Sequence, residues 1–270
     1  MMSDPFRIRA SSWGSLFDCA HKWEGEHLLG MWKPYSPRAL LGTAIHASTA
    51  AFDDARVNHF DLTPDDTAGI FVETLRDPGK DVDWSTSDIR IRDAERIGLT
   101  LHTRYCLEVS PNYQFEAVEM ETVPLVIDCG HGIQIQLTGT LDRSRIRKTT
   151  NGIGISDLKT GKASVQQGKA KTKGFKAQLG TYELLYEHTS GKQVTEPGEI
   201  IGLKTSGSPD IGTGEIHGAK ETLIGTDSSH GLIEYAKEYF RTGLFPPNPS
   251  SYLCDEKYCA RWSTCKFKDQ

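Results

Sequence analysis

Long apolar segments are missing from this sequence. Within its 270 residues, no run approaches the roughly 18 apolar residues that a membrane-spanning helix requires. The opening MMSDPFRIRA also lacks the apolar stretch of a secretion signal. We therefore expect a cytoplasmic protein that does not associate with a membrane. Hydrophobic residues (37%) and charged residues (25%) occur in the proportions of a globular protein, which excludes a disordered chain.

An excess of positive charge is missing as well. The formal net charge is −5 and the sequence pI is about 6.0, so the protein is not coated with positive charge. One segment departs from this balance, because six lysines and no acidic residue lie from Lys159 to Lys176. A lysine run of this kind is usually a solvated loop, and the alternative is a local strip that binds phosphates.

Cysteine is scarce and unevenly placed. One cysteine lies near the N-terminus, three cluster near the C-terminus and two stand alone (Cys19; Cys254, Cys259 and Cys265; Cys106 and Cys129). In a cytoplasmic chain, such a cluster indicates a metal site more than disulfides. We interpret the two isolated cysteines as core or surface thiols.

The order of elements predicts an α/β or α+β protein with a mixed sheet. Ser36 suits a helix N-cap and Pro37 the first helical position. Helices are expected at 11–30, 36–55, 62–80, 90–108, 176–190 and 228–243, and strands within 115–128, 133–147, 152–159 and 198–206. We expect one domain over 1–270, divided into a mainly helical part (1–112), a core (113–245) and a proline-broken tail (246–270) that Cys19 completes.

A hairpin between the strands at 133–147 and 152–159 brings two acids together. If the turn is centred between Thr149 and Thr150, paired residue numbers add to 299, so Asp142 faces Asp157 with Cβ atoms about 5 Å apart. Two carboxylates at that distance repel each other unless a cation lies between them, and Mg²⁺ or Mn²⁺ prefers such oxygen ligands. Lys159 shares the face of Asp157, because side chains along a strand alternate.

Three further side chains accompany this pair. His46 lies on an upstream helix, and Gln178 and Tyr182 lie four residues apart on the helix that follows. The simpler alternative is an exposed strand end with a surface ion pair, a buried helix histidine and two residues that pack a helix on the sheet. The presence of all these groups together favours a reactive site.

Four motifs occur along the chain in the order LGTAIH, LTGTLDR, ISDLKTGK and QLGTY. Together they resemble the motifs of the PD-(D/E)xK nucleases of the RecB type, including the CRISPR-adaptation and AddB-like domains that carry an iron–sulfur cluster. The resemblance extends from Ser11 to Cys265. It implies a restriction-endonuclease-like fold, in which helices flank a mixed β-sheet.

The resemblance also implies roles for individual residues. It implies that His46, Asp142, Asp157 and the backbone carbonyl of Leu158 bind Mg²⁺ or Mn²⁺, that Lys159 is the catalytic lysine, and that Gln178 and Tyr182 support the site and contact DNA. Glu119 and Glu121 on a preceding strand are candidates to support the ligands, and nothing in the sequence decides between them. The lysines that follow the active strand are expected to guide the DNA backbone (Lys162, Lys169, Lys171, Lys173 and Lys176).

The resemblance further implies that four cysteines hold a 4Fe–4S cluster (Cys19, Cys254, Cys259 and Cys265). One feature departs from the family, because four residues separate Cys254 from Cys259 where the family usually has two. The gap of five residues from Cys259 to Cys265 fits. Zinc bound by four cysteines is the main alternative, and unbound thiols are another.

These implications predict a metal-dependent DNA nuclease, more specifically an exonuclease that acts on single strands or DNA ends in recombination or repair. A recombination or strand-annealing protein would be its partner. The hypothetical source is a phage or another mobile element, and a phage-encoded protein would act in the host cytoplasm. The alternatives are a non-catalytic iron–sulfur protein that binds DNA, an iron–sulfur redox or sensor protein, and a nuclease that processes ends in CRISPR adaptation. The oligomeric state is not predicted.

Overall fold

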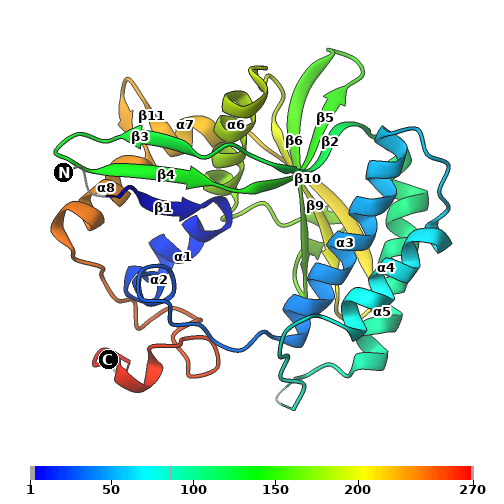
Figure 1. Cartoon of the computed structure of the whole chain (residues 1–270), viewed down its shortest axis with the longest axis horizontal. Coiled ribbons are helices and arrows are strands. Elements are labelled where there is room, and N and C mark those ends of the chain that lie inside the picture. Colours follow the sequence, from blue (N-terminus) through cyan, green and yellow to red (C-terminus); the bar gives the residue numbers. More distant parts are fainter. Residues whose placement is uncertain (1–3, 86, 269–270) are drawn as a thin grey trace.

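A computed structural model describes residues 4–85 and 87–268 of the chain. Its centre is a seven-stranded mixed sheet in the order β2-β5-β6-β9-β10-β8-β7, and a second sheet has the order β1-β4-β3. Figure 1 shows helices on both faces of the large sheet, with α3, α4 and α5 on one side and α6 on the other. The expected mixed sheet flanked by helices is confirmed.

The strands of the two sheets and of a small hairpin are β1 (Phe6–Arg9), β2 (Gln114–Glu121), β3 (Leu125–Asp128), β4 (Gln134–Thr138), β5 (Thr140–Arg147), β6 (Gly152–Gly161), β7 (Val165–Gln166), β8 (Lys169–Ala170), β9 (Gly198–Lys204), β10 (Asp210–Ile216), β11 (Gly225–Thr226) and β12 (Ser229–His230). The α-helices are α1 (Trp13–Asp18), α2 (Ala20–His27), α3 (Pro37–Val57), α4 (Pro64–Arg76), α5 (Ile91–Arg104), α6 (Lys176–Ser190), α7 (Ala219–Ile224) and α8 (Leu232–Thr242). None of the helices among the described residues is long and apolar enough to span a membrane.

Helix α3 begins as the sequence predicts. The Ser36 side chain accepts a hydrogen bond from the Ala39 amide, and Pro37 occupies the first turn. One apolar face of α3 packs with α4 and α5 over Leu158 of β6 and Ile201 of β9. This packing fixes α3 across the sheet, beside the strands that carry the two predicted aspartates.

Helix α6 covers the opposite face of the sheet. Its bounds match the expected helix, and Leu179 and Tyr186 pack over Ile155 and Ile200. At Gly180 the backbone of α7 approaches α6 so closely that an added Cβ atom would lie 2.3 Å from the Ala219 carbonyl oxygen. Glycine is therefore required where these two helices meet.

Three expected elements are divided in the structure. The run 115–128 breaks between β2 and β3, where Pro124 cannot donate a ladder hydrogen bond, and the run 133–147 breaks at Gly139. The expected helix at 11–30 is two helices, because Cys19 has extended dihedral angles (φ −145°, ψ 94°). Strand β1 was not expected; it pairs in parallel with β4 and extends the second sheet.

Candidate active site

The β5–β6 hairpin has the predicted register. Ser144 pairs with Ile155 and Ile146 pairs with Ile153, so the paired numbers add to 299. The ladder ends at Arg143 and Ser156, one position short of the two aspartates. Beyond that point the Asp142 side chain fills the space between the strands, where Oδ2 accepts a hydrogen bond of 2.7 Å from the Leu158 amide.

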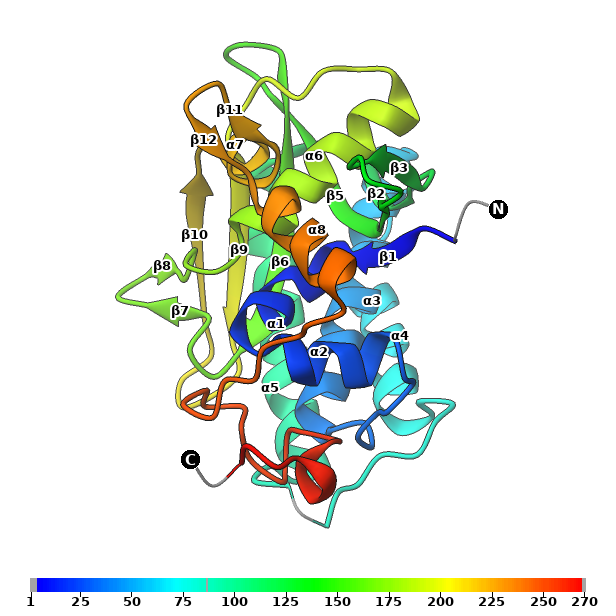
Figure 2. The same ribbon diagram turned by 90° about the vertical axis from the view of Figure 1, so that its left-hand side faces the viewer.

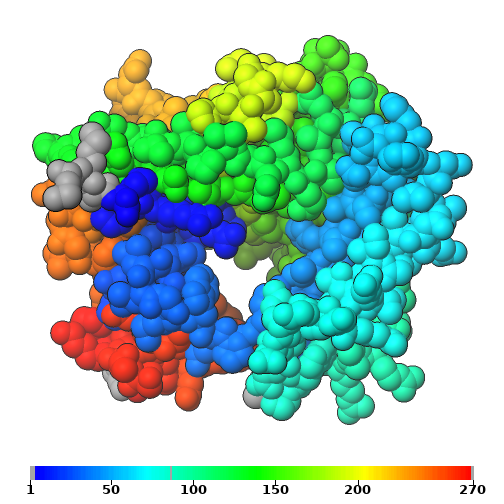
Figure 3. All heavy atoms as spheres, viewed as in Figure 1, coloured from blue at the N-terminus to red at the C-terminus, as the bar shows by residue number. Residues whose placement is uncertain are grey.

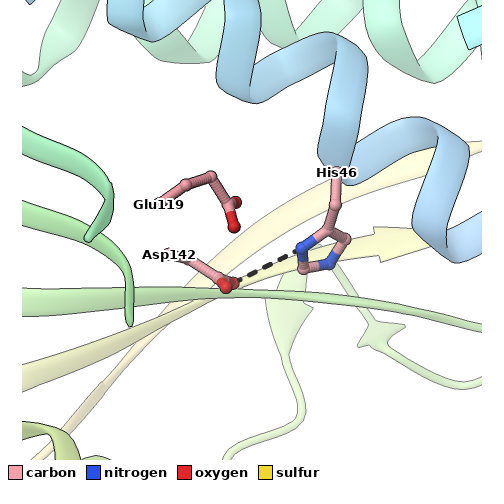
Figure 4. A group of neighbouring side chains, drawn as sticks. All are labelled: His46, Glu119 and Asp142. Carbon is pink, nitrogen blue, oxygen red and sulfur yellow. Dashed lines mark ion pairs between the residues drawn. The ribbon is translucent and has the colours of Figure 1, made fainter. Parts of the chain in front are cut away.

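A group of potential ligands forms at this end of the hairpin. One ligand atom each from His46 of α3, Glu119 of β2 and Asp142 of β5 lies within 4.8 Å of the others. Figure 4 shows the three side chains pointing toward a common space between α3 and the sheet. The His46 Nδ1 atom lies 3.6 Å from Asp142 Oδ2. The structure thus brings Glu119, and not Glu121, to the two predicted ligands.

Glu119 reaches this position through an unusual backbone conformation. Its φ angle is +45°, a left-handed value that is rare for a residue with a side chain and rarer within a strand. The β2–β5 register also shifts between Phe115 and Ala117, as at a β-bulge. Local strain of this kind is often found where a side chain must be aimed at a functional site.

Asp157 and Lys159 lie side by side next to this group. The Lys159 Nζ atom is 2.5 Å from Asp157 Oδ2, which makes the two side chains an ion pair. Gln178 of α6 donates hydrogen bonds to Asp157 Oδ1 (3.1 Å) and to the Tyr182 hydroxyl (3.3 Å). The Asp157 side chain is 1% exposed, so α6 holds a buried carboxylate in one orientation.

The electrostatics of the group favour a bound cation. Burial, with the nearby charge of Asp142, raises the pKa of Asp157 to about 7, although Lys159 opposes this shift. Partial burial and the same Asp142 charge raise the pKa of Glu119 to about 7, although 43% of that side chain remains exposed. Burial lowers the pKa of His46, so its ring is neutral and offers a lone pair.

The residues present fit a divalent metal ion. The donor set is one imidazole and two carboxylates, which suits Mn²⁺ or Mg²⁺. Asp157 Oδ2 is buried with the Lys159 ammonium beside it, and this carboxylate oxygen retains a lone pair that a metal ion could use. The His46 ring also contacts the backbone of Leu158, the predicted carbonyl ligand.

Comparisons with known proteins agree with this geometry. The family model described as the PD-(D/E)XK nuclease superfamily matches residues 10–266. The chain belongs to the PD-(D/E)XK nuclease superfamily. Its fold is similar to the crystal structure of a Eubacterium rectale protein provisionally described as an exonuclease, with a TM-score of 0.50 and 14% sequence identity over 90% of this chain and 84% of that one. No curated protein matches the sequence.

As a member of this nuclease superfamily, the protein is expected to act on DNA with the help of divalent metal ions. The predicted residues His46, Asp142, Asp157 and Lys159 and the two α6 residues all lie at one site. Glu119 is the residue whose importance the sequence left undecided. The only signal for it was its place on the strand before β5, which Glu121 shared.

A buried arginine of the nuclease supports the ligands from below. The fully buried Arg143 has its Nε atom 2.7 Å from Asp53 Oδ2 of α3 and its Nη1 atom 3.3 Å from Glu119 Oε1. The same Nη1 atom donates a hydrogen bond to the backbone carbonyl of Asp142. Tyr105 donates a hydrogen bond of 2.6 Å to the same Asp53 carboxylate. Arg143 therefore connects the helix that carries His46 to both strands that carry carboxylate ligands.

The lysine run does not form one strip beside the nuclease site. All five lysines after Lys159 are exposed, but the chain leaves β6 and forms the β7–β8 hairpin. Lys169 lies on β8, beyond β9 and β10, which is about 14 Å from β6 at ordinary strand spacing. Lys162 stays near the end of β6, where it pairs with Asp88. Lys176 begins α6 and follows Phe175, whose ring centroid lies 5.3 Å from Lys159 Nζ.

The four clustered cysteines line one small cavity between the tail and the first helices (Cys19, Cys254, Cys259 and Cys265). The Asn248 amide donates a hydrogen bond to Cys19 Sγ (3.4 Å), and Arg261 donates to the His21 carbonyl and to Glu24 of α2. Figure 2 shows the tail folded below α2. The other two thiols match their interpretation, since Cys106 is buried in the core and Cys129 is partly buried against another cluster.

Proposed function

We propose that the protein is a metal-dependent deoxyribonuclease that removes nucleotides from the ends of single DNA strands. One observation carries this proposal: the ligand atoms of His46, Glu119 and Asp142 converge at the diverging end of the β5–β6 hairpin. The Asp157–Lys159 ion pair lies beside them. A carboxylate-rich group next to a lysine is the arrangement that phosphodiester hydrolysis needs.

Each residue would have a distinct task in hydrolysis. A divalent cation in the group would neutralise charge on the phosphate and acidify a water molecule. Lys159, held by Asp157, would place positive charge beside the phosphate and orient the water oxygen that attacks phosphorus. The attack breaks the P–O bond to the leaving nucleotide, whose oxygen takes up a proton. Gln178 would keep the Asp157 carboxylate in place through its hydrogen bond to Oδ1.

The shape of the molecule supports a single strand as substrate. Figure 3 shows an opening in the middle of one face, bordered by the N-terminal segment and by α3, the helix that carries His46. A strand end could enter such an opening beside α3, whereas a circular molecule has no end to insert. Similarity in fold to a protein provisionally described as an exonuclease is consistent with this mode of action.

A 4Fe–4S cluster at the four cysteines is part of this proposal. Four thiolates around a single zinc ion lie about 3.8 Å apart, given Zn–S bonds of about 2.3 Å. Among residues 4–85 and 87–268, no three cysteine sulfurs lie within 4.8 Å of one another. Their wider separation supports a larger group, and the amide that donates to Cys19 suits a thiolate ligand. The cluster would hold the tail against α1 and α2.

Cleavage assays with labelled DNA test the proposed activity. Linear single strands, blunt duplexes and circular single strands are incubated with Mn²⁺, Mg²⁺ or EDTA. We expect the linear single strand alone to be shortened, only with metal, and faster with Mn²⁺ because an imidazole is among the ligands. Lys159→Ala should remove cleavage, whereas Lys148→Ala, at the tip of the same hairpin, should not. Cleavage that persists in EDTA or in Lys159→Ala would contradict the proposal.

The cluster has its own test, independent of activity. Anaerobically purified protein should be brown, absorb broadly near about 400 nm and contain iron and sulfide. Cys259→Ala should remove this absorption. A colourless protein that contains zinc would replace the cluster with a zinc site.

A further inference from the structure

A groove separate from the metal group lies where three distant segments meet. A cavity of about 730 Å³ is lined by residues 33–38, by Asp83, Ser87 and Asp88, by Lys162, and by Tyr252 and residues 256–258. Figure 2 shows the tail and the segment before α5 at the same end of the molecule. The volume of the cavity is typical of a ligand-binding site, and none of its lining residues belongs to the metal group.

Two elements connect this groove to the candidate active site. Helix α3 carries Arg38 in its first turn and His46 two turns later, about 12 Å along the helix axis. Strand β6 carries Asp157, and Lys162 follows its end, about 17 Å away along an extended chain. The elements touch between these points, because a Cβ atom at Gly42 would lie 2.5 Å from Thr160 Oγ1.

Aromatic rings form one wall of the groove. Tyr252 is 83% exposed, so its ring is open to solvent. Its centroid lies 5.8 Å from that of Tyr258, with the two ring planes inclined by 36°. Exposed rings beside a charged groove are the usual platform on which the bases of single strands stack.

Cations in the groove form a potential phosphate site. Arg38 binds the Asp88 carboxylate through two nitrogens, Nε at 2.7 Å from Oδ1 and Nη2 at 3.1 Å from Oδ2. Lys162 pairs with the same carboxylate. A guanidinium and an ammonium that bind one carboxylate can also bind a phosphate. Asp88 and a phosphate would therefore compete for Arg38 and Lys162.

We propose that this groove binds single-stranded DNA, with bases stacked on Tyr252 and Tyr258 and a phosphate at Arg38 and Lys162. The inference rests on the proposed function and extends it to a second binding site, which holds the strand about four to five nucleotides from the metal group, at about 3.4 Å per nucleotide. A duplex does not fit this chemistry, because its base faces are already stacked. The tail thus contributes to substrate binding as well as to the cysteine site.

Affinity measurements on two opposite variants test the proposal. Fluorescence anisotropy of labelled oligothymidines is measured in EDTA, so that no cleavage occurs. For a strand of about 20 nucleotides, Tyr252→Ala should weaken binding at least about fivefold, and Tyr252→Phe should stay within about twofold of the wild type. Tyr235→Ala is the matched control, since Tyr235 is a 53% exposed ring on α8 outside the groove.

Asp88→Asn should have the opposite effect. Removing this carboxylate frees Arg38 and Lys162, so binding should tighten about threefold or more at low salt and depend more steeply on salt. A misfolded variant loses affinity and cannot mimic this gain. Unchanged affinity in both Tyr252→Ala and Asp88→Asn would overturn the inference, as would an equal loss for duplex and single strand in Tyr252→Ala.

The same assays separate the inference from the proposed function. If the wild-type protein neither binds single strands in EDTA nor cleaves them with Mn²⁺, the proposed function fails and the inference fails with it. If the wild type cleaves linear strands but the groove variants bind them like the wild type, only the inference is overturned.

Discussion

Replacing Gly180 by alanine should loosen α6 and with it the candidate active site. A Cβ atom at this position would lie 2.3 Å from the carbonyl oxygen and 2.7 Å from the carbonyl carbon of Ala219, whereas non-bonded carbon atoms rest about 3.5–4.0 Å apart. These are backbone atoms, so no side-chain rotation relieves the clash and α7 must shift by about 1 Å. Overpacking costs about 1–3 kcal/mol, and a clash with backbone atoms belongs to the upper part of this range, about 2–3 kcal/mol. Alanine regains about 1 kcal/mol of this through its higher helix propensity.

We therefore expect Gly180→Ala to lower the free energy of unfolding by about 1–2 kcal/mol, as measured by urea unfolding followed by tryptophan fluorescence. Gly69→Ala is the matched control: Gly69 lies within α4 with nothing within 4 Å of the added Cβ, so its free energy of unfolding should rise by about 0.5–1 kcal/mol. Because Gln178 lies on the same helix, the cleavage rate of folded Gly180→Ala should also fall at least about tenfold. A Gly180→Ala protein as stable as the wild type would refute this account of the packing.

Three further predictions concern the carboxylates. Glu119→Gln should raise the Mn²⁺ concentration for half-maximal cleavage at least about tenfold, as measured by metal titration, because it removes one anionic ligand. Asp53→Ala should lower the free energy of unfolding by about 3–5 kcal/mol in urea, since it leaves Arg143 buried without its main partner. Burial raises the pKa of Glu183 from 4.5 to about 7, so the folded state holds this proton more tightly than the unfolded state and stability falls as pH rises between these values. Glu183→Gln should therefore raise the unfolding temperature at pH 8 but hardly at pH 4, and an equal shift at both pH values would contradict this reasoning.

Local patterns predicted much of the fold. The Ser36 cap, the bounds of α6 and the β5–β6 register follow from capping, apolar periodicity and one short turn, and all three are confirmed. The second sheet could not be predicted in this way. It depends on the parallel pairing of β1 with β4, which are more than 100 residues apart, and on breaks at Pro124 and Gly139 within runs that alternate like single strands.

The part of the candidate site that lies on one face of the β5–β6 hairpin was predictable. Asp142, Asp157 and Lys159 lie together because strand side chains alternate and because the short turn fixes the register of the hairpin. Both features can be read from the sequence without any tertiary contact. The groove around Tyr252 was not predictable, because its lining residues come from three distant segments that share no local pattern. Only the packing of α3 on β6 and the folding of the tail below α2 bring them together.

The choice between Glu119 and Glu121 shows what alternation cannot decide. Both glutamates would share a face of a regular strand. Glu121 pairs with Thr140, whereas Glu119 lies between the pairs Val118–Arg143 and Met120–Leu141, at the position opposite Asp142. The φ angle of Glu119 is +45°. Such a backbone costs about 1–3 kcal/mol for a residue with a side chain, and the ion pair of Glu119 with Arg143 helps to hold it. Glycine at 119 would relieve this strain but would remove the carboxylate. The backbone conformation alone would therefore favour glycine at this position, whereas the ligand group requires the carboxylate of glutamate.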